Sequence, residues 1–234
     1  MTMQHAIRAT SCVVIPMFNE ASAIAPVVLD VLSRFDRVVC VDDGSSDDSA
    51  QLARAAGAVV VQHPINLGQG AALETGIRYA LLDPDVTHVV TFDADGQHDV
   101  ADAAAMVLAA VQDDIQVVLG SRFLGDSQDI PPARRLLLRA ATRFSRVTTG
   151  LVLTDAHNGL RVFRRDAAAR LSLKMHGMSH ASEILVKIAA ERWSYAEHPV
   201  TITYTDYSRA KGQRAYNAFN IAFDVAVSRL RYAS

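Results

Sequence analysis

Residues 89–98 read Val-Val-Thr-Phe-Asp-Ala-Asp-Gly-Gln-His, and this stretch decides which fold the chain can adopt. Its first four residues favour a buried β-strand, which runs directly into two aspartates, Asp93 and Asp95. In a loop just past a strand, carboxylates with this spacing can turn toward one point. Such oxygen ligands suit Mg²⁺ or Mn²⁺ that is shared with a phosphate. The alternative is a polar loop in which Asp95 or Asp99 caps the next helix. The stretch alone leaves both interpretations open.

The first half of the chain alternates strands and helices around this stretch. Strands are predicted at residues 12–15, 37–41, 58–62, 87–92 and 115–119, with a helix after each of the first four. This regular alternation of strands and helices is typical of βαβ units, so we expect a mostly parallel sheet with right-handed crossovers. The predicted fold class is therefore α/β: a single domain whose sheet is flanked by helices.

The second half is less regular. Helices are predicted at 134–147, 166–171 and 182–192, and strands at 159–163 and 200–204.

The two ends of the chain are predicted to differ from the domain between them. Residues 1–10 look like a loose leader, and the domain is expected to span residues 11–214. Residues 215–234 carry an apolar stripe at helical spacing, which predicts an amphipathic helix. This helix would pack on the domain, meet a partner or lie on a membrane surface.

Composition excludes several classes of protein. The chain has 234 residues, half of them hydrophobic, which is enough for a sizeable core. A net charge of −2 and a pI near 6.4 give no case for binding nucleic acid. Cys12 and Cys40 lie in apolar runs and indicate buried thiols of a reduced compartment. We see neither a signal peptide nor an apolar run of ~18 residues. We therefore expect a cytoplasmic protein, with peripheral contact at the cytoplasmic membrane face left open.

Polar residues follow each of the first four strands. In chain order they are Asn19-Glu20, Asp42-Asp43, Asn66-x-Gly68 and Asp93-x-Asp95. The carboxyl ends of parallel strands share one edge of a sheet, and ligands bind there. No Gly-x-Gly-x-x-Gly and no Gly-Lys-Ser/Thr phosphate loop is present, and the carboxylates would repel a bare pyrophosphate. A divalent ion between Asp93, Asp95 and a pyrophosphate resolves this repulsion, and Asp42 or Asp43 can accept hydrogen bonds from a base or ribose.

Several motifs, in matching order and spacing, resemble family 2 glycosyltransferases with a GT-A fold. They are Val14-Ile15-Pro16-Met17-Phe18-Asn19-Glu20, Val41-Asp42-Asp43-Gly44-Ser45-Ser46-Asp47, Asn66-Leu67-Gly68-Gln69-Gly70, Phe92-Asp93-Ala94-Asp95-Gly96-Gln97-His98 and Gly120-Ser121-Arg122. Residues 159–163 and the Arg209-x-x-Gly212 motif extend the similarity to the dolichyl-phosphate mannose synthase and polyprenyl-phosphate glycosyltransferase branch. The resemblance covers about residues 11–214.

The resemblance implies a role for each group of residues. A nucleotide-sugar site is implied for Pro16, Asn19, Glu20, Asp42, Asp43, Gly68, Asp93, Ala94 and Asp95. Mg²⁺ or Mn²⁺ on a UDP- or GDP-sugar would be held by Asp93, Asp95 and Gln97. An acceptor phosphate would face Arg122, Arg134, Arg135, Arg139 and Arg214.

Arg209 would complete the catalytic set with Asp93, Asp95 and Arg122, by meeting the donor phosphates from a loop that closes over them. Where the branch carries Ser-Lys after Gly212, this chain has Arg214 and Ala215. Arg214 is expected to supply the missing cation.

The predicted activity is metal-dependent, inverting transfer of a hexose from a sugar nucleotide to a polyprenyl phosphate. A phosphate nucleophile has its second pKa near ~6, so it is already ionised and needs cations more than a strong base. The alternatives are a soluble or glycan hydroxyl acceptor, with Asp155 as candidate base, and a non-catalytic nucleotide-sugar binding module. The arginines 135, 139 and 143 also fit one solvated helical stripe. His98 and His157 are interpreted as structural and kept out of the metal shell.

Overall fold

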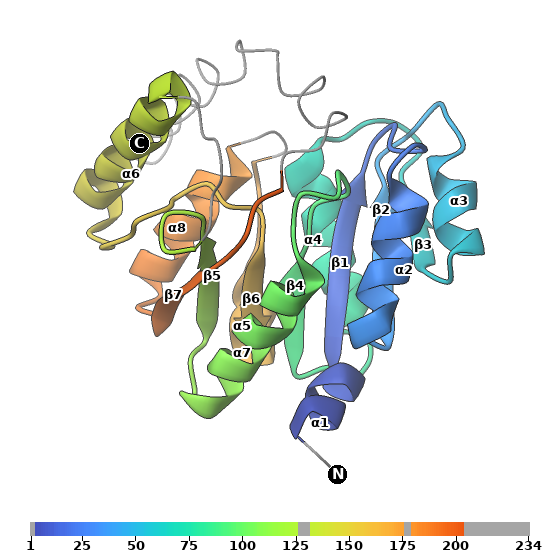
Figure 1. Cartoon of the computed structure of the whole chain (residues 1–234), viewed down its shortest axis with the longest axis horizontal. Helices are drawn as coiled ribbons and strands as arrows, with labels where there is room; N and C mark the ends of the chain where they lie inside the picture. Colours follow the sequence, from blue (N-terminus) through green and yellow to red (C-terminus); the bar gives the residue numbers. More distant parts are fainter. Residues whose placement is uncertain (1–2, 126–131, 176–178, 204–234) are drawn as a thin grey trace.

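The computed structural model describes residues 3–125, 132–175 and 179–203, and within them one sheet of seven strands lies between two layers of helices (Figure 1). The strands are β1 Ser11–Met17, β2 Arg37–Asp42, β3 Val59–Gln62, β4 His88–Thr91, β5 Val117–Ser121, β6 Arg161–Arg164 and β7 Tyr195–Pro199. The helices are α1 Met3–Thr10, α2 Ile24–Arg34, α3 Ser49–Ala55, α4 Gln69–Ala80, α5 Val100–Gln112, α6 Pro132–Thr149, α7 Arg165–Arg170 and α8 His180–Ala190.

The sheet is mostly parallel, as predicted. Its strand order is β3-β2-β1-β4-β6-β5-β7. β1 pairs in parallel with β2 and β4, β2 with β3, and β5 with β7. β6 is inserted between β4 and β5 and runs antiparallel to both. The carboxyl ends of β1, β2, β4 and β5 therefore lie at one edge, the upper one in Figure 1.

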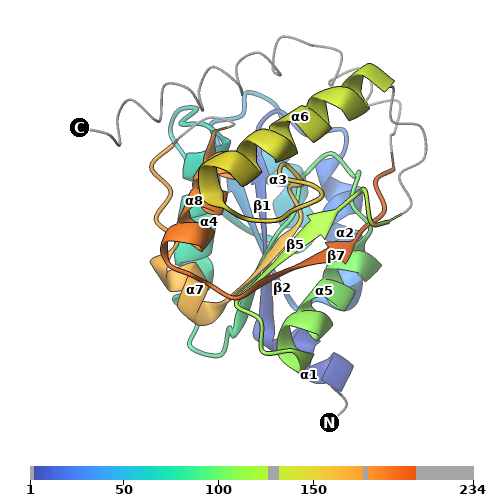
Figure 2. The same ribbon diagram turned by 90° about the vertical axis from the view of Figure 1, so that its left-hand side faces the viewer.

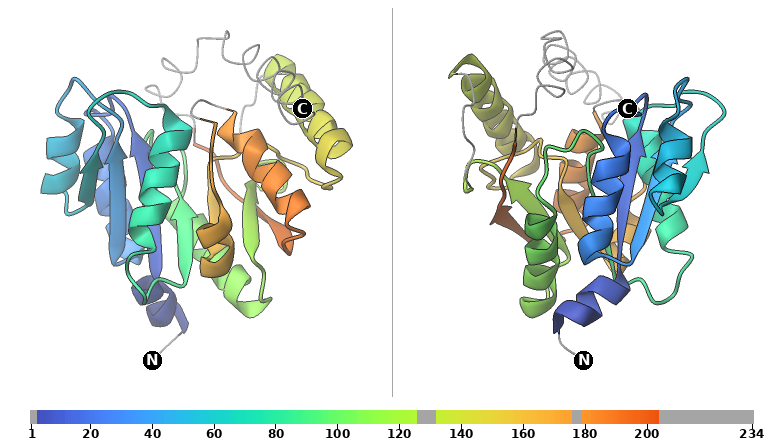
Figure 3. Two further views of the ribbon diagram at one scale, coloured as in Figure 1. Left: turned by 180° about the vertical axis from the view of Figure 1, so that it is seen from behind. Right: turned by 45° about the vertical axis from the view of Figure 1, so that its right-hand side comes forward.

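Alternate residues of β1 enter two separate cores. Val13 and Ile15 pack with the helices α2, α3 and α5, whereas Cys12 and Val14 face α4, α7 and α8. Figures 2 and 3 show these two helical layers on opposite faces of the sheet. Because both faces are covered, the inner strands β1, β2, β4 and β5 are largely buried on both sides, which explains their continuous apolar runs.

The two cysteines are buried, as the sequence predicted. Burial raises the pKa of Cys12 and of Cys40 to about 12, so both thiols stay protonated at neutral pH. Among the described helices, none combines the length and apolar character needed to cross a lipid bilayer.

Two local predictions were wrong. Residues 3–10 form α1 instead of a loose leader, because Ile7 is buried there and the helix packs on α5. The strand predicted at 200–204 lies at 195–199, where a half-buried edge strand pairs with β5. The predicted helix at 215–234 lies outside the described residues.

Candidate active site

The polar residues predicted to converge do meet at the carboxyl edge of the sheet. Asn19 and Glu20 follow β1, Asp42 ends β2 with Asp43 directly after it, and Asp93 and Asp95 follow β4. β1 lies between β2 and β4, so the nucleotide-binding and metal-binding candidates flank one strand.

Asp93 and Asp95 lie close enough to influence each other's charge. Burial, followed by the charge of Asp93, raises the pKa of Asp95 to about 6. Burial opposes ionisation of Asp93 too, but the His98 hydrogen bond and nearby positive charges hold the pKa of Asp93 below its usual value. A divalent cation would relieve this crowding of two carboxylates.

The donor set fits Mg²⁺ or Mn²⁺. One or two carboxylates commonly share Mg²⁺ with substrate phosphates, and the described residues contain no preformed cluster of three His, Cys, Asp or Glu side chains. Gln97 lies in the same loop, where its N–H donates to Asp95 Oδ1 at 3.1 Å. A ligand role for the Gln97 side chain stays a prediction.

Two side chains that sequence reasoning did not place at the metal site hold Asp93. His98 Nε2 lies 3.0 Å from Asp93 Oδ2, and Gln69 Nε2 donates to Asp93 Oδ1 at 3.4 Å. The His98 ring is buried and packs edge-on against Phe92. His98 therefore holds Asp93, a metal-binding candidate, in place. The one feature of the sequence that pointed to this contact is the position of His98 five residues after Asp93. The capping alternative also holds in part, since Asp99 Oδ1 accepts the N–H of Ala101 and caps α5.

Asp43 organises the loop after β3. Its Oδ1 accepts the N–H of Leu67 at 2.9 Å and lies 2.7 Å from His63 Nδ1, while Oδ2 accepts the N–H of Gly68 at 2.7 Å. Asp42 is engaged in a similar way, with Ser45 and Gln62. Direct contact of either carboxylate with a nucleoside stays a prediction; the hydrogen bonds show that Asp43 holds the loop after β3.

Asn19 joins the loops after β1 and β2. It adopts a positive φ of 54°, which Asn tolerates better than most residues. Its Oδ1 accepts the N–H of Ser46 at 2.9 Å, and its own N–H donates to Ser45 Oγ at 2.9 Å. The next residue, Glu20, is buried, and its N–H donates to Ser49 Oγ.

Three further residues assigned to the nucleotide-sugar site lie at the same edge. Pro16 is buried in β1, opposite Val41. Ala94 is buried between the two metal-binding candidates, and Gly68 immediately precedes α4 with a φ of 95°.

We expect Asp43→Ala to raise the KM for the sugar nucleotide about tenfold, which corresponds to ~1.4 kcal/mol. The change removes the acceptor for Leu67 and Gly68, so the loop that borders the nucleotide site loses its anchor. Steady-state kinetics at fixed Mn²⁺ would measure this, with the exposed Asp48→Ala as matched control. A shifted metal requirement with an unchanged donor KM would contradict the assignment.

Arg122 forms a buried ion pair at the end of β5. Its Nε lies 2.5 Å from Asp155 Oδ2, and its backbone N–H donates to the same oxygen at 3.2 Å. The side chains of Arg122 and Asp155 are 9% and 1% exposed. Contact of Arg122 with an acceptor phosphate stays a prediction. Because the Asp155 carboxylate is already paired with Arg122, it is poorly placed to act as a base.

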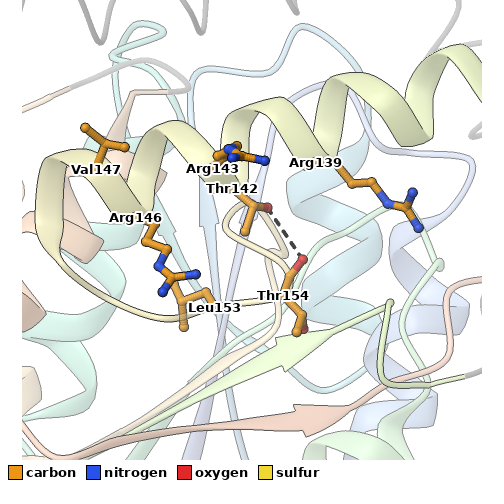
Figure 4. Close-up of a pocket in the computed structure, with 7 residues that line it drawn as sticks. All are labelled: Arg139, Thr142, Arg143, Arg146, Val147, Leu153 and Thr154. Atoms are coloured by element: carbon orange, nitrogen blue, oxygen red, sulfur yellow. Dashed lines mark hydrogen bonds between the residues drawn. The ribbon is translucent and has the colours of Figure 1, made fainter.

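Three exposed arginines lie on α6, along a groove whose lining includes Thr154, the residue before Asp155. Arg139, Thr142, Arg143, Arg146, Val147, Leu153 and Thr154 line a groove of about 700 Å³ (Figure 4). Its three arginines are exposed, and Arg146 extends from α6 toward Leu153. Arg143 belongs to the helical stripe of arginines predicted from the sequence, but neither Arg143 nor Arg146 was assigned to the acceptor. Arg134 and Arg135 also lie on α6, but their side chains, and all of Arg209 and Arg214, are outside what the structure describes.

The loop that forms the far wall of this groove is fastened to β5 and β7. Thr154 Oγ1 lies 2.6 Å from Ser121 Oγ, and Glu197 accepts the N–H groups of Thr154 and Asp155 at 2.8–3.0 Å. Glu197 was missed because nothing in the sequence relates it to a loop more than 40 residues earlier.

Arg161 is close enough to both Asp93 and Asp155 to interact with the charge of each. It is almost fully buried, at 2% exposed. Burial lowers the pKa of Arg161 to about 10, although the negative charges of Asp93 and Asp155 act to raise it. It therefore remains a cation at neutral pH. Burial, followed by the charge of Arg161, lowers the pKa of neighbouring His157 to about 4, so that imidazole is neutral.

Comparisons with known proteins identify the family and the fold. Residues 12–172 match the model of Glycosyl transferase family 2. Over 93% of this chain and 95% of the relative, the sequence is 27% identical to a UDP-N-acetylglucosamine–dolichyl-phosphate N-acetylglucosaminyltransferase of Methanococcus voltae. It is 31% identical to a dolichyl-phosphate hexose transferase of Haloferax volcanii, over 80% of each chain.

The fold is shared with a solved structure of glucosyl-3-phosphoglycerate synthase from Mycobacterium tuberculosis, in complex with Mn²⁺ and UDP-glucose. The TM-score is 0.67 at 21% identity, over 87% of this chain and 74% of that one. The GT-A fold predicted from the sequence is thereby confirmed. The chain therefore belongs to glycosyl transferase family 2 and is a glycosyltransferase that uses a sugar nucleotide.

Proposed function

We propose that the protein transfers a hexose, in a metal-dependent and inverting reaction, from a UDP- or GDP-sugar to a polyprenyl phosphate. The dolichyl-phosphate substrates named for the two similar archaeal enzymes support this acceptor class. Such an acceptor is embedded in a membrane, so the enzyme would work as a peripheral protein on the cytoplasmic face.

The arginine-lined groove is the main observation in favour of a phosphate acceptor. Three exposed guanidinium groups border it, and its wall residue Thr154 precedes Asp155, the partner of Arg122. Arginine is suited to phosphate because its planar fork donates two parallel hydrogen bonds. A hydroxyl acceptor would need a general base, and the candidate from the sequence, Asp155, is buried against Arg122.

Each part of the edge would serve one step of the reaction. Asp93 and Asp95 would hold Mg²⁺ or Mn²⁺, which when bound offsets the negative charge of the leaving diphosphate. His98 and Gln69 keep Asp93 in position, and Asp43 keeps the loop beside the nucleotide in shape. The arginines of α6 would draw in the acceptor phosphate. Its oxygen then forms a bond to the anomeric carbon as the bond to the diphosphate breaks, which inverts that centre.

A transfer assay with labelled donors tests the proposal. The full chain would be incubated with UDP- or GDP-hexoses, Mn²⁺ and a polyprenyl phosphate in detergent, and product measured in the organic phase. Product is expected with the phosphate, absent with the corresponding polyprenol, and absent in EDTA until Mn²⁺ is restored. Transfer to the polyprenol or to a soluble glycan, with none to the phosphate, would contradict the acceptor assignment.

We expect Arg139→Gln combined with Arg143→Gln to raise the KM for polyprenyl phosphate at least tenfold. Two charge-assisted contacts worth ~1.5–3 kcal/mol each would be lost. The donor KM should change less than twofold, because these side chains lie on α6 and not beside β1 or β2.

The matched control is Arg34→Gln with Arg54→Gln, which removes two exposed arginines from α2 and α3. Equal acceptor KM values for the α6 variant and this control would mean that the α6 arginines form only a solvated stripe.

A further inference from the structure

Gly159 lies directly opposite Asp93. β4 and β6 are antiparallel, with Thr91 facing Arg161, so continuing both strands by two residues brings Asp93 opposite Gly159. The approach is fixed by a hydrogen bond of 2.7 Å from Thr91 Oγ1 to the carbonyl oxygen of Gly159. The chain thus runs past the metal-binding candidate at close range.

No side chain fits at this position. A Cβ atom built on Gly159 would lie 2.1 Å from Asp93 Oδ2 and 2.6 Å from Asp93 Cγ. Gly159 is not among the described glycines with a positive φ. Space, and not backbone conformation, is therefore what requires glycine here.

The Asp93 carboxylate is the group that would have to move to make room for a Cβ atom on Gly159. It is the end of a short side chain that is 32% exposed, so it can rotate toward solvent without disturbing the strands. That rotation would break its contacts with His98 and Gln69. A methyl group on Gly159 would therefore cost the fold little but would move the carboxylate from its place.

We propose that Gly159 is a positioning residue for the metal site: its missing side chain provides the space in which Asp93 meets the divalent ion. This inference rests on the proposed metal role of Asp93. It assigns a requirement of the donor site to the segment just before β6, a strand that contributes no carboxylate of its own.

Mn²⁺ binding by full-length variants tests this inference, measured calorimetrically with UDP or GDP, whichever promotes Mn²⁺ binding by the wild-type protein. Gly159→Ala should weaken Mn²⁺ binding at least tenfold, with a Tm within a few degrees of wild type (~2–4 °C per kcal/mol at this size). The matched control is Gly120→Ala on β5. Its Cβ would be crowded by the Leu160 carbonyl at 3.0 Å, and no Asp93 atom is among its nearest contacts. This control should lower Tm yet leave Mn²⁺ affinity within twofold.

A double-mutant cycle keeps the inference testable if Gly159→Ala folds poorly. In an Asp93→Ala background the clashing carboxylate is gone, so adding Gly159→Ala should no longer lower Tm. Wild-type Mn²⁺ affinity in Gly159→Ala, or equal Tm losses in both backgrounds, would overturn it. Failure of the proposed metal site is distinct, because the wild-type protein itself would then bind no Mn²⁺ with either UDP or GDP.

Discussion

Asp95→Asn is expected to lower kcat by about 10³ or more, which corresponds to ~4 kcal/mol of transition-state stabilisation. An amide oxygen is a weaker ligand than a carboxylate and brings no charge to the ion. The fold should not suffer. Asp93 and Asp95 repel each other without a metal, and the substitution removes that repulsion. The variant should therefore match or exceed the wild-type Tm in EDTA and lose any increase in Tm that Mn²⁺ with donor produces.

Asp99→Asn is the matched control, with the same substitution four residues later. Asp99 caps α5, and Asn caps a helix about as well as Asp, so this variant should keep both activity and stability. Activity would be measured at buffered Mn²⁺ concentrations. Wild-type turnover by Asp95→Asn under those conditions would show that the ion is held elsewhere.

Asp155→Ala is expected to destabilise the protein by ~3–5 kcal/mol, because it removes one partner of a buried ion pair. The change takes away the carboxylate that Arg122 Nε contacts at 2.5 Å, while the guanidinium stays almost fully buried. At ~2–4 °C per kcal/mol for a chain of this size, Tm should fall on the order of 10 °C. Urea unfolding would give the free energy directly.

Asp36→Ala provides a control with the same bond length. Arg8 Nε lies 2.5 Å from Asp36 Oδ1, but both side chains are more than 40% exposed. Water screens such a pair, so its removal should cost less than ~1 kcal/mol. Similar losses for the two variants would mean that burial does not determine the contribution of the Arg122–Asp155 pair.

The donor half of the molecule was predictable because its signals are local. Each strand from β1 to β4 is a short apolar run that ends in a polar loop, so the sequence indicated both the strand and the edge where ligands bind. Parallel pairing then required Asp43 and Asp93 to lie on neighbouring loops. The α1 helix was missed because its buried side rests mainly on Ile7, too little apolar surface for a clear period.

The remaining features depend on contacts between distant residues. The insertion of β6 between β4 and β5 has no signature in residues 159–163, and it alone makes Gly159 face Asp93. The pairing of Arg122 with Asp155 spans 33 residues. β7 was displaced by five residues because Tyr-Ala-Glu-His-Pro shows no apolar alternation, whereas Val200 and Ile202 just after it do.

The central position of β6 also fixes an order of assembly during synthesis. Strands β1 to β4 are adjacent in the sheet and complete by residue 91. β5 pairs only with β6 and β7 among the described strands, so it cannot join them until residues 161–164 have been made. Until then β4 is an open edge, and unpaired edges readily pair with other chains. We therefore expect a nascent chain that ends between residues 92 and 160 to pair with other chains more readily than the finished enzyme does.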